Sequence, residues 1–185
     1  DDPENWPDVD TLRGQILFHQ SEEKRLNNEI PEEMVCSIFL VSTKVIRDML
    51  ALKHRKIANE QIELIAKIAK QQSATIQENF EQYSVKVESI PKDIEQLSDI
   101  KDFMNGLPNE LDKQQNVIKQ CMQIYDCLSF FHHKFEDEEE YDKMWNVFGA
   151  PKETMERIEK QQGFLDKEKE KFIKQMDNNK GDFSS

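Results

Sequence analysis

The sequence predicts an all-α fold, and three properties of its 185 residues support this prediction. Glycine and proline are scarce, with five and six copies, so few positions interrupt a helix. Charged residues make up 34% and apolar residues 37%, a balance typical of helices with one buried and one solvated face. Apolar residues also recur at spacings of three and four. We expect an elongated antiparallel bundle of five or six helices, two of them long.

Residues 1–42 are expected to form a lead-in segment with one short helix and one apolar run. Residues 1–10 contain two prolines and should be extended. A helix is expected over about 11–28, with three apolar residues on one side: Leu12, Ile16 and Leu26. Residues 35–41, with the sequence VCSIFLV, are the most apolar run in the chain. Its periodicity leaves open whether this run is a buried strand or the start of a helix.

Residues 43–177 are expected to form the helical bundle, and their longest periodic segment runs from about Thr43 to Val87. A continuous helix of this length is about 65 Å long, at about 1.5 Å per residue, so it is a rod. Gln72 and the charged residues 53–56 interrupt its apolar stripe. The stripe consists of Val45, Met49, Leu52, Ile62, Ile65, Ala69, Ile76, Phe80, Tyr83 and Val87.

Residues 89–111, with the sequence SIPKDIEQLSDIKDFMNGLPNEL, predict a sharp corner between two helices. Pro91 suits the first turn of one helix, where its missing N–H costs nothing. Gly106 suits the left-handed cap at the end of that helix, and Pro108 can begin the next, over about 109–133. So short a connection predicts antiparallel neighbours.

The last part of the chain predicts two further helices and a frayed end over residues 178–185. Asp137 and Glu140 fit a capping pattern, and Gly149 with Pro151 should close the first of these helices. The aromatic residues Tyr141, Trp145 and Phe148 are expected in the core, with a groove for a partner helix as the alternative. The core residues that we expect for the whole bundle are Leu97, Phe103, Leu107, Leu111, Tyr125, Leu128 and Trp145.

The charge balance indicates protein partners rather than nucleic acid or membrane. The chain has 25 basic and 37 acidic residues and a net charge of -12, and no basic patch of the kind that releases counterions from DNA, RNA or anionic lipid. No apolar run approaches the roughly 20 residues that span a bilayer. The start, DDPENWPDVD, lacks the features of a signal peptide and begins without Met, so we expect an intracellular, soluble piece of a longer protein. Three cysteines without a disulfide framework fit a reducing compartment.

No residue set in the sequence predicts catalysis, a cofactor or a metal. None of the five glycines has the spacing of a phosphate-binding loop. Cys121, Cys127, His132 and His133 are not spaced as zinc ligands, and no glutamate stands three residues before a histidine. The acidic run 136–140 lacks the glycine and alternating oxygen ligands of a calcium loop and suits a helix N-terminus. We therefore expect that the chain is not an enzyme by itself.

Several weak motifs occur in a defined order along the chain. They are Ile30–Pro31 before the apolar run, Pro91 with Leu97 and Phe103, Leu107–Pro108, Tyr125 with Leu128, and Trp145. This series, over about residues 28–175, resembles the tail of axonemal dynein heavy chains, in the helical region just before the linker. That region tends to carry a tryptophan directly before its last proline, where this chain has Ala150–Pro151.

The resemblance implies a structural and assembly role in a motor of the ciliary or flagellar axoneme. The ATP-driven ring and the linker would lie outside these residues, and this segment would connect the motor to its axonemal cargo. The implied partners are other dynein heavy chains, intermediate or light chains and axonemal docking proteins, without direct microtubule contact. The alternative is a free-standing coiled-coil adaptor or tether that dimerises through the helix over 43–87.

Overall fold

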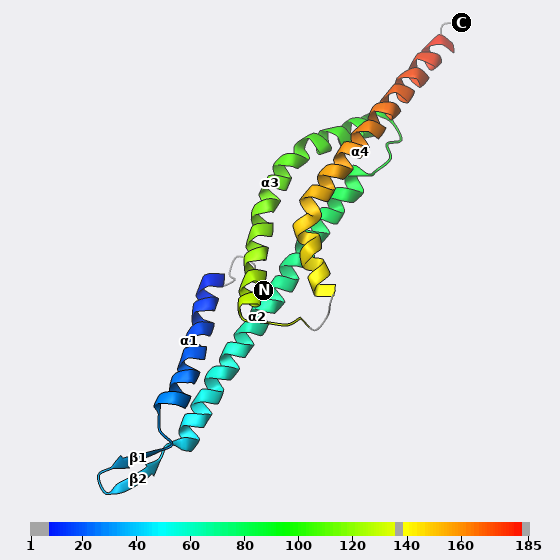
Figure 1. The fold of residues 1–185 in the computed structure, drawn as a ribbon. Helices are drawn as coiled ribbons and strands as arrows, with labels where there is room; N and C mark the ends of the chain where they lie inside the picture. Colours follow the sequence, from blue (N-terminus) through cyan, green and yellow to red (C-terminus); the bar gives the residue numbers. More distant parts are fainter. Residues whose placement is uncertain (1–7, 136–138, 183–185) are drawn as a thin grey trace. The chain divides into compact units, whose positions relative to one another are not determined.

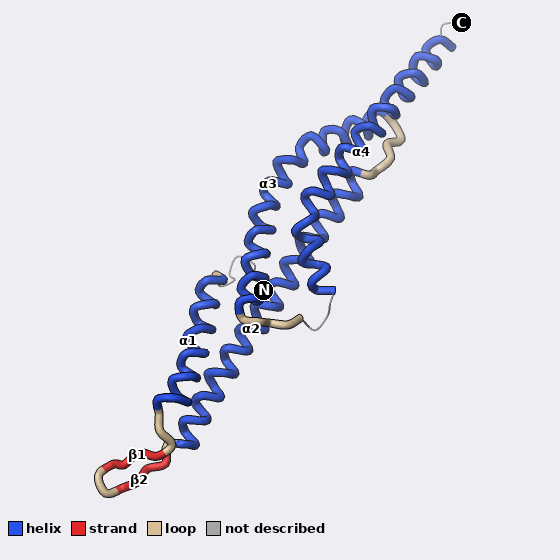
Figure 2. The backbone as a smooth tube through the Cα atoms, in the orientation of Figure 1, coloured by secondary structure: helices blue, strands red, loops and turns tan. Residues whose placement is uncertain are grey.

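The computed structural model describes residues 8–135 and 139–182, with side chains up to Met176. The described residues form α1 (Val9–Glu29), β1 (Glu33–Cys36), β2 (Phe39–Ser42), α2 (Lys44–Val87), α3 (Ile94–Phe130) and α4 (Glu139–Asp182), as Figures 1 and 2 show. This part of the chain is therefore mostly helical, as the sequence predicts, with one small sheet. The lead-in before residue 8, the acidic residues 136–138 that include Asp137, and the end 183–185 lie outside the described residues.

The chain divides into two compact units that share two of the helices. The first unit contains the residues up to Lys70 together with Gln123–Lys134, and the second contains Gln71–Met122 together with the residues from Phe135 on. Each of α2 and α3 therefore contributes one part to each unit.

In the first unit, α1 packs antiparallel against the first part of α2. Asp8 begins α1 by accepting a hydrogen bond from the Thr11 backbone N–H at 3.2 Å. Three side-chain pairs link the two helices, and the pair nearest the start of α1 involves the latest residue of α2: Gln15–Gln61, His19–His54 and Glu23–Arg55. The end of α3 adds Arg13 stacked 4.2 Å from the ring centre of Phe130. The core of this unit includes Leu12, Ile16, Leu26, Ala51, Ala58, Ile62, Ile65, Tyr125 and Leu128.

The second unit is built from the later part of α2, most of α3, and α4. The α2–α3 connection is held against α4 by an ion pair between Glu88 and Arg157 at 2.7 Å. Lys101 of α3 pairs with Asp166 of α4 at 2.5 Å. The shared core includes Ile76, Phe80, Val87, Leu97, Ile100, Met104, Leu107, Leu111, Ile118, Cys121, Val147, Ile158 and Leu165. Three helices thus bury their apolar faces against one another.

The expected corner at residues 106–108 is wrong, because α3 continues through Pro108. Proline removes one backbone hydrogen bond, at a cost of about 3 kcal/mol in a helix interior. Met104, Leu107 and Leu111 lie on both sides of this position and are all buried, so an unbroken helix keeps them on one packed face. Figure 1 shows α3 curving along this part, as expected where a proline interrupts the hydrogen bonds.

Two further helix boundaries also differ from the prediction. α4 continues through Pro151, where buried Val147, Thr154 and Ile158 hold the same face against the core. α3 begins at Ile94 rather than at Pro91. Asp93 accepts a hydrogen bond from the Gln96 backbone N–H at 2.8 Å, while the Gln96 side chain accepts one from the Lys92 N–H at 3.1 Å. This reciprocal cap fixes the start of α3.

Candidate protein-interaction surface

The apolar run that the sequence left as strand or helix forms the β1–β2 hairpin. Glu33 pairs with Ser42 and Cys36 pairs with Phe39, which leaves a two-residue loop of Ser37 and Ile38. Ser37 has a φ of 59°, a left-handed conformation that glycine adopts more easily than serine. The loop follows the geometry of tight hairpin turns, in which a central residue has positive φ.

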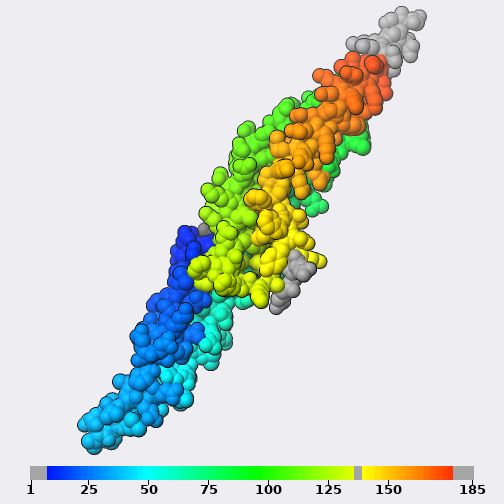
Figure 3. Space-filling view, in the orientation of Figure 1, coloured from blue at the N-terminus to red at the C-terminus, as the bar shows by residue number. Residues whose placement is uncertain are grey.

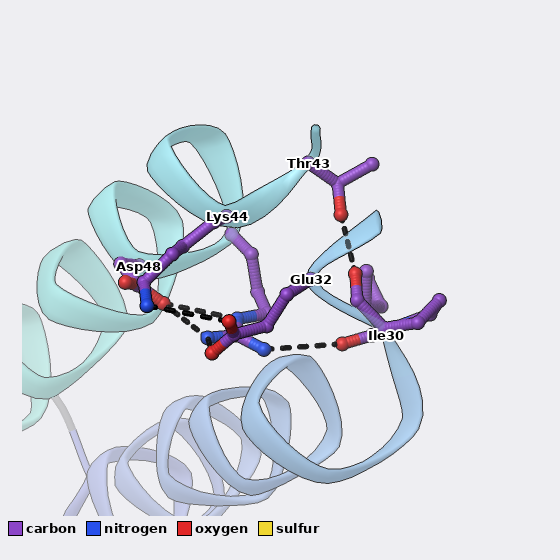
Figure 4. Close-up of polar contacts among 7 residues, drawn as sticks. Ile30, Glu32, Thr43, Lys44 and Asp48 are labelled. Atoms are coloured by element: carbon purple, nitrogen blue, oxygen red, sulfur yellow. Dashed lines mark hydrogen bonds and ion pairs between the residues drawn. The ribbon is translucent and has the colours of Figure 1, made fainter. Parts of the chain in front are cut away.

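Polar contacts fasten the base of the hairpin to the first turn of α2, as Figure 4 shows. The Thr43 backbone N–H donates to the Glu32 carbonyl at 2.8 Å, and the Thr43 hydroxyl donates to the Pro31 carbonyl. The Glu32 carboxylate pairs with Arg47 at 3.1 Å and with Lys44 at 3.2 Å. Arg47 also pairs with Asp48 at 2.8 Å. These contacts fix where the hairpin leaves the helix pair of the first unit.

The charges at this base neutralise one another. Hydrogen bonds from Arg47 and then from Lys44 hold the pKa of the Glu32 carboxyl below its usual value. A hydrogen bond to Asp48 correspondingly raises the pKa of the Arg47 guanidinium. Because these groups satisfy one another, the base does not add a net charge to the apolar residues beyond it.

The hairpin itself exposes apolar side chains on both faces. All eight strand residues are exposed, and Ile38 in the loop is 89% exposed. In the space-filling view the hairpin protrudes from the ends of α1 and α2 (Figure 3). Its exposed apolar residues are Met34, Val35, Ile38, Phe39, Leu40 and Val41.

The first turns of α2, which follow the hairpin in the chain, expose further apolar residues. Buried Ala51 and Ala58 face α1, whereas the other side of the same turns exposes Val45, Ile46, Met49, Leu50 and Leu52. We call these five residues and the six apolar hairpin residues the hairpin surface. Contiguous exposed apolar patches of more than a few hundred Å² are rare on monomeric soluble proteins and mark interaction sites.

The backbone of the hairpin adds a second means of binding. Within residues 8–135 and 139–182, the sheet has only the strands β1 and β2, so each strand has one edge without a neighbouring strand. An open edge presents backbone N–H and C=O groups to which an extended segment of another protein can pair. The hairpin surface can therefore bind a partner through apolar burial and through strand pairing.

The seven residues that we expected in the core differ from one another in burial. Five of them are buried: Leu97, Leu107, Leu111, Tyr125 and Leu128. Phe103 is half-buried, 4.1 Å from the Lys86 amine and 6.4 Å from the ring of Tyr83. Trp145 is 63% exposed and packs edge-on against exposed Phe148, so the expectation that it lies in the core is wrong.

The residues of the hairpin surface were missed because an apolar run was expected to be buried. The signal that could have identified them is the spacing of two four-residue segments, EMVC and FLVS, around the two residues Ser37 and Ile38. That loop lacks the asparagine or glycine that usually marks such turns. Val45, Met49 and Leu52 were assigned to the same stripe as Ile62, but they lie on the exposed side of α2.

The described part of the chain offers little for metal or membrane chemistry. It contains no group of three or more His, Cys, Asp or Glu side chains that could hold a metal ion. Cys121 and Cys127 are buried in α3, and burial raises the pKa of the Cys121 thiol to about 11, which keeps it protonated. Among the described helices, none is long and apolar enough to cross a membrane.

Comparisons with known proteins agree on one group of relatives. No family model matches the chain. Dynein axonemal heavy chain 1 of Mus musculus is 26% identical over 175 residues, which cover 94% of this chain and 4% of that protein. The Homo sapiens protein of the same name is 26% identical over 170 residues, or 91% of this chain and 4% of that protein. The Rattus norvegicus protein is 26% identical over 105 residues, or 57% of this chain.

The mouse and human alignments span 94% and 91% of this chain, the rat alignment spans 57%, and each covers only a small part of the relative. The chain covers about 4% of the length of the mouse and human proteins that it matches. The chain is therefore similar to a short segment of dynein axonemal heavy chain 1.

Proposed function

We propose that the chain is a structural and assembly segment of an axonemal dynein heavy chain, located in the tail just before the linker. The observation that carries the proposal is the alignment of 94% of the chain with 4% of a heavy chain named as axonemal. The order of the motifs from Ile30–Pro31 to Trp145 supports the tail position. In this proposal, ATP hydrolysis and movement along microtubules belong to other parts of the heavy chain.

The hairpin surface supports the assembly role. Eleven apolar side chains stand exposed on the hairpin and the first turns of α2. At roughly 25 cal/mol for each Å² of apolar area, covering such a surface with a partner contributes several kcal/mol. We expect the partner to be another dynein heavy chain, an intermediate or light chain, or an axonemal docking protein. The net charge of -12 argues against direct contact with acidic microtubule surfaces.

A denaturing blot of isolated cilia tests the parent protein. With an antibody raised against residues 89–151, we expect one very large band that co-extracts with other axonemal arm proteins. A band near 22 kDa, or signal confined to the cell body, would instead indicate a free-standing protein.

Alkylation of Cys36 tests the assembly role. This thiol lies exposed at the end of β1, next in the chain to Val35 of the hairpin surface, whereas Cys121 is buried. In the isolated chain, iodoacetamide should modify Cys36 rapidly and leave Cys121 unmodified. In arms extracted intact from axonemes, peptide mass spectrometry should find Cys36 protected. Equal modification of Cys36 in the free chain and in intact arms would contradict an assembly role for the hairpin surface.

One observation favours a second candidate, the free-standing coiled-coil adaptor. The exposed apolar residues at the start of α2 include Val45, Met49 and Leu52, which are spaced like positions of a dimer seam. Sedimentation equilibrium of the isolated chain separates the candidates. A stable dimer that Met49→Glu disrupts supports the adaptor, and a monomer at micromolar concentration supports the tail segment.

A further inference from the structure

A groove runs between α3 and α4 in the second unit and has a volume of about 700 Å³. Residues of both helices form its walls. The α3 wall includes Pro108, Leu111, Ile118 and Met122, and the α4 wall includes Phe148, Pro151 and Met155.

The walls of this groove are apolar and partly open to solvent. Phe148 is 61% exposed although it is a large aromatic residue, and Met155 is 38% exposed. Leu111 and Ile118 beneath them are buried, so the floor is packed while the upper walls lack a covering group. Methionine side chains such as Met122 and Met155 adapt to differently shaped partners.

The geometry of the walls fits a third helix. The lining residues of α3 run from Pro108 to Met122 at spacings of three and four, which is about 21 Å of helix at about 1.5 Å per residue. Lys101 and Asp166 show that α3 and α4 are antiparallel here, because they lie before and after these lining residues. A groove between two such helices accepts an amphipathic helix with apolar residues at i, i+3 or i+4 and i+7.

The charges beside the groove indicate which kind of helix it binds. Lys119 lines the α3 wall and Lys152 lines the α4 wall, against the single acidic residue Asp112. Among the described residues Lys119 has no ion-pair partner, and Lys152 meets Glu156 only at 4.0 Å on an exposed surface. This locally basic site is unusual in a chain with a net charge of -12.

The opposite side of α4 provides a contrast within the same unit. The groove there lies between α2 and α4 and is lined with charged and polar residues, including Glu81, Glu88, Glu153 and Arg157. Arg157 and Glu88 pair across it at 2.7 Å. That side has polar walls and a close ion pair of its own, whereas the α3–α4 groove has apolar walls and two lysines without an ion pair shorter than 4.0 Å among the described residues.

We propose that the α3–α4 groove binds an amphipathic helix of a partner protein, with acidic residues flanking its apolar stripe. The apolar stripe covers Phe148, Met155 and Met122, and the acidic flanks lie beside Lys119 and Lys152. The proposal is independent of the dynein assignment, because it rests on the groove alone.

Two synthetic helical peptides of about 15 residues test the proposal on the purified 185-residue chain. Both carry leucines at spacings of three and four; one has glutamates and the other lysines beside this stripe. By fluorescence anisotropy, we expect the glutamate peptide to bind at least tenfold more tightly, and its binding to weaken as salt rises. Phe148→Ser should reduce that binding at least tenfold. Ile173→Ser changes an equally apolar, exposed residue of α4 outside the groove and should leave it unchanged.

The double variant Lys119→Glu, Lys152→Glu keeps the apolar walls and reverses the charge. This variant should bind the lysine peptide more tightly than the glutamate peptide. Because only the charge has changed, this result would separate the effect of charge from that of apolar burial. Equal binding of the two peptides by the unmodified chain would overturn the proposal. So would unchanged binding by Phe148→Ser with a retained thermal melt. A dimer of the chain that Phe148→Ser abolishes would overturn it in favour of a second copy as the occupant.

Discussion

The two parts of α2 differ in how completely they are packed. Its first turns belong to the first unit and expose Val45, Ile46, Met49, Leu50 and Leu52. Its later turns belong to the second unit and bury Ile76, Phe80 and Val87. Both parts of α2 carry several large apolar residues, so residue type alone does not explain the difference.

The number of neighbouring helices and strands explains why the two parts of α2 differ in burial. The first turns of α2 contact α1 and the hairpin base, which leaves one side of the helix apolar and open. The later turns lie among both α3 and α4, so two helices cover the apolar stripe. An apolar stripe therefore predicts that a helix needs a partner, but it does not show whether the partner lies in the same chain.

The largest expected effect comes from breaking the packed part. Leu107 is 1% exposed in α3, so Leu107→Asp places an unpaired carboxylate in the core and should destabilise the fold by more than about 4 kcal/mol. Trp145→Ala changes an exposed aromatic residue of the same unit and should cost less than about 1 kcal/mol. Guanidinium unfolding followed by circular dichroism compares the two. Similar losses in both variants would mean that Trp145 is packed after all.

This contrast also shows what the sequence could and could not predict. Residues such as Leu107, Leu111 and Leu128 were placed correctly in the core, because they recur with the period of a helix on faces that other helices cover. Trp145 follows the same period on α4, yet it is exposed and packs against Phe148, a residue that lines the open α3–α4 groove. Periodicity identifies a face of a helix, but only the positions of the other helices decide whether that face is buried.

Two predicted helix ends were wrong for a related reason. Gly106 with Pro108, and Gly149 with Pro151, have the local chemistry of a helix stop. The buried residues on either side of each pair gain more from staying on one continuous face than the missing hydrogen bond costs. At the hairpin the turn was not predicted, because its two-residue loop contains no glycine and so gives only a weak sequence signal for a turn.

The second prediction uses pH to probe the packed part. Cys121 is fully buried, and desolvation raises its pKa from the usual 9.0 to about 11. A raised pKa in the folded state means that this thiol stabilises the fold fully below pH 9. That contribution, roughly 2 to 3 kcal/mol, is lost as the pH rises from about 9 to 11, because only the unfolded chain ionises there.

Unfolding free energies at pH 8 and pH 10.5 measure this effect in the unmodified chain and in Cys121→Ala. The unmodified chain should lose more stability between the two pH values than the variant does. Cys36→Ala, which removes an exposed thiol instead of a buried one, serves as the control. The same pH dependence in all three proteins would show that Cys121 is not buried as described.

The third prediction concerns the base of the exposed hairpin. Arg47 joins Glu32, Asp48 and the Ile30 carbonyl, with its side chain 13% exposed. Because Glu32 and Asp48 are about half exposed, water screens these pairs, and Arg47→Ala should lower the global stability only slightly. The loss should be local. Hydrogen exchange should accelerate at the Thr43 amide and in the strands, while amides in the middle of α3 keep their rates. A uniform acceleration along the chain would contradict a local role.

The smallest expected effect comes from the hairpin loop. Ser37 has a φ of 59°, where glycine is free of the strain that a Cβ causes, so Ser37→Gly should stabilise the hairpin by about 0.5 kcal/mol. Hydrogen exchange in β1 and β2 should slow slightly, and the global melt should stay the same. Ser42→Gly is the matched control, because it places glycine in the extended strand and should speed exchange.

If Ser37→Gly also binds a partner more tightly, the hairpin binds as a preformed surface, because a more rigid hairpin loses less conformational freedom on binding. Unchanged binding would indicate that the apolar residues of the hairpin, rather than its backbone geometry, determine its affinity.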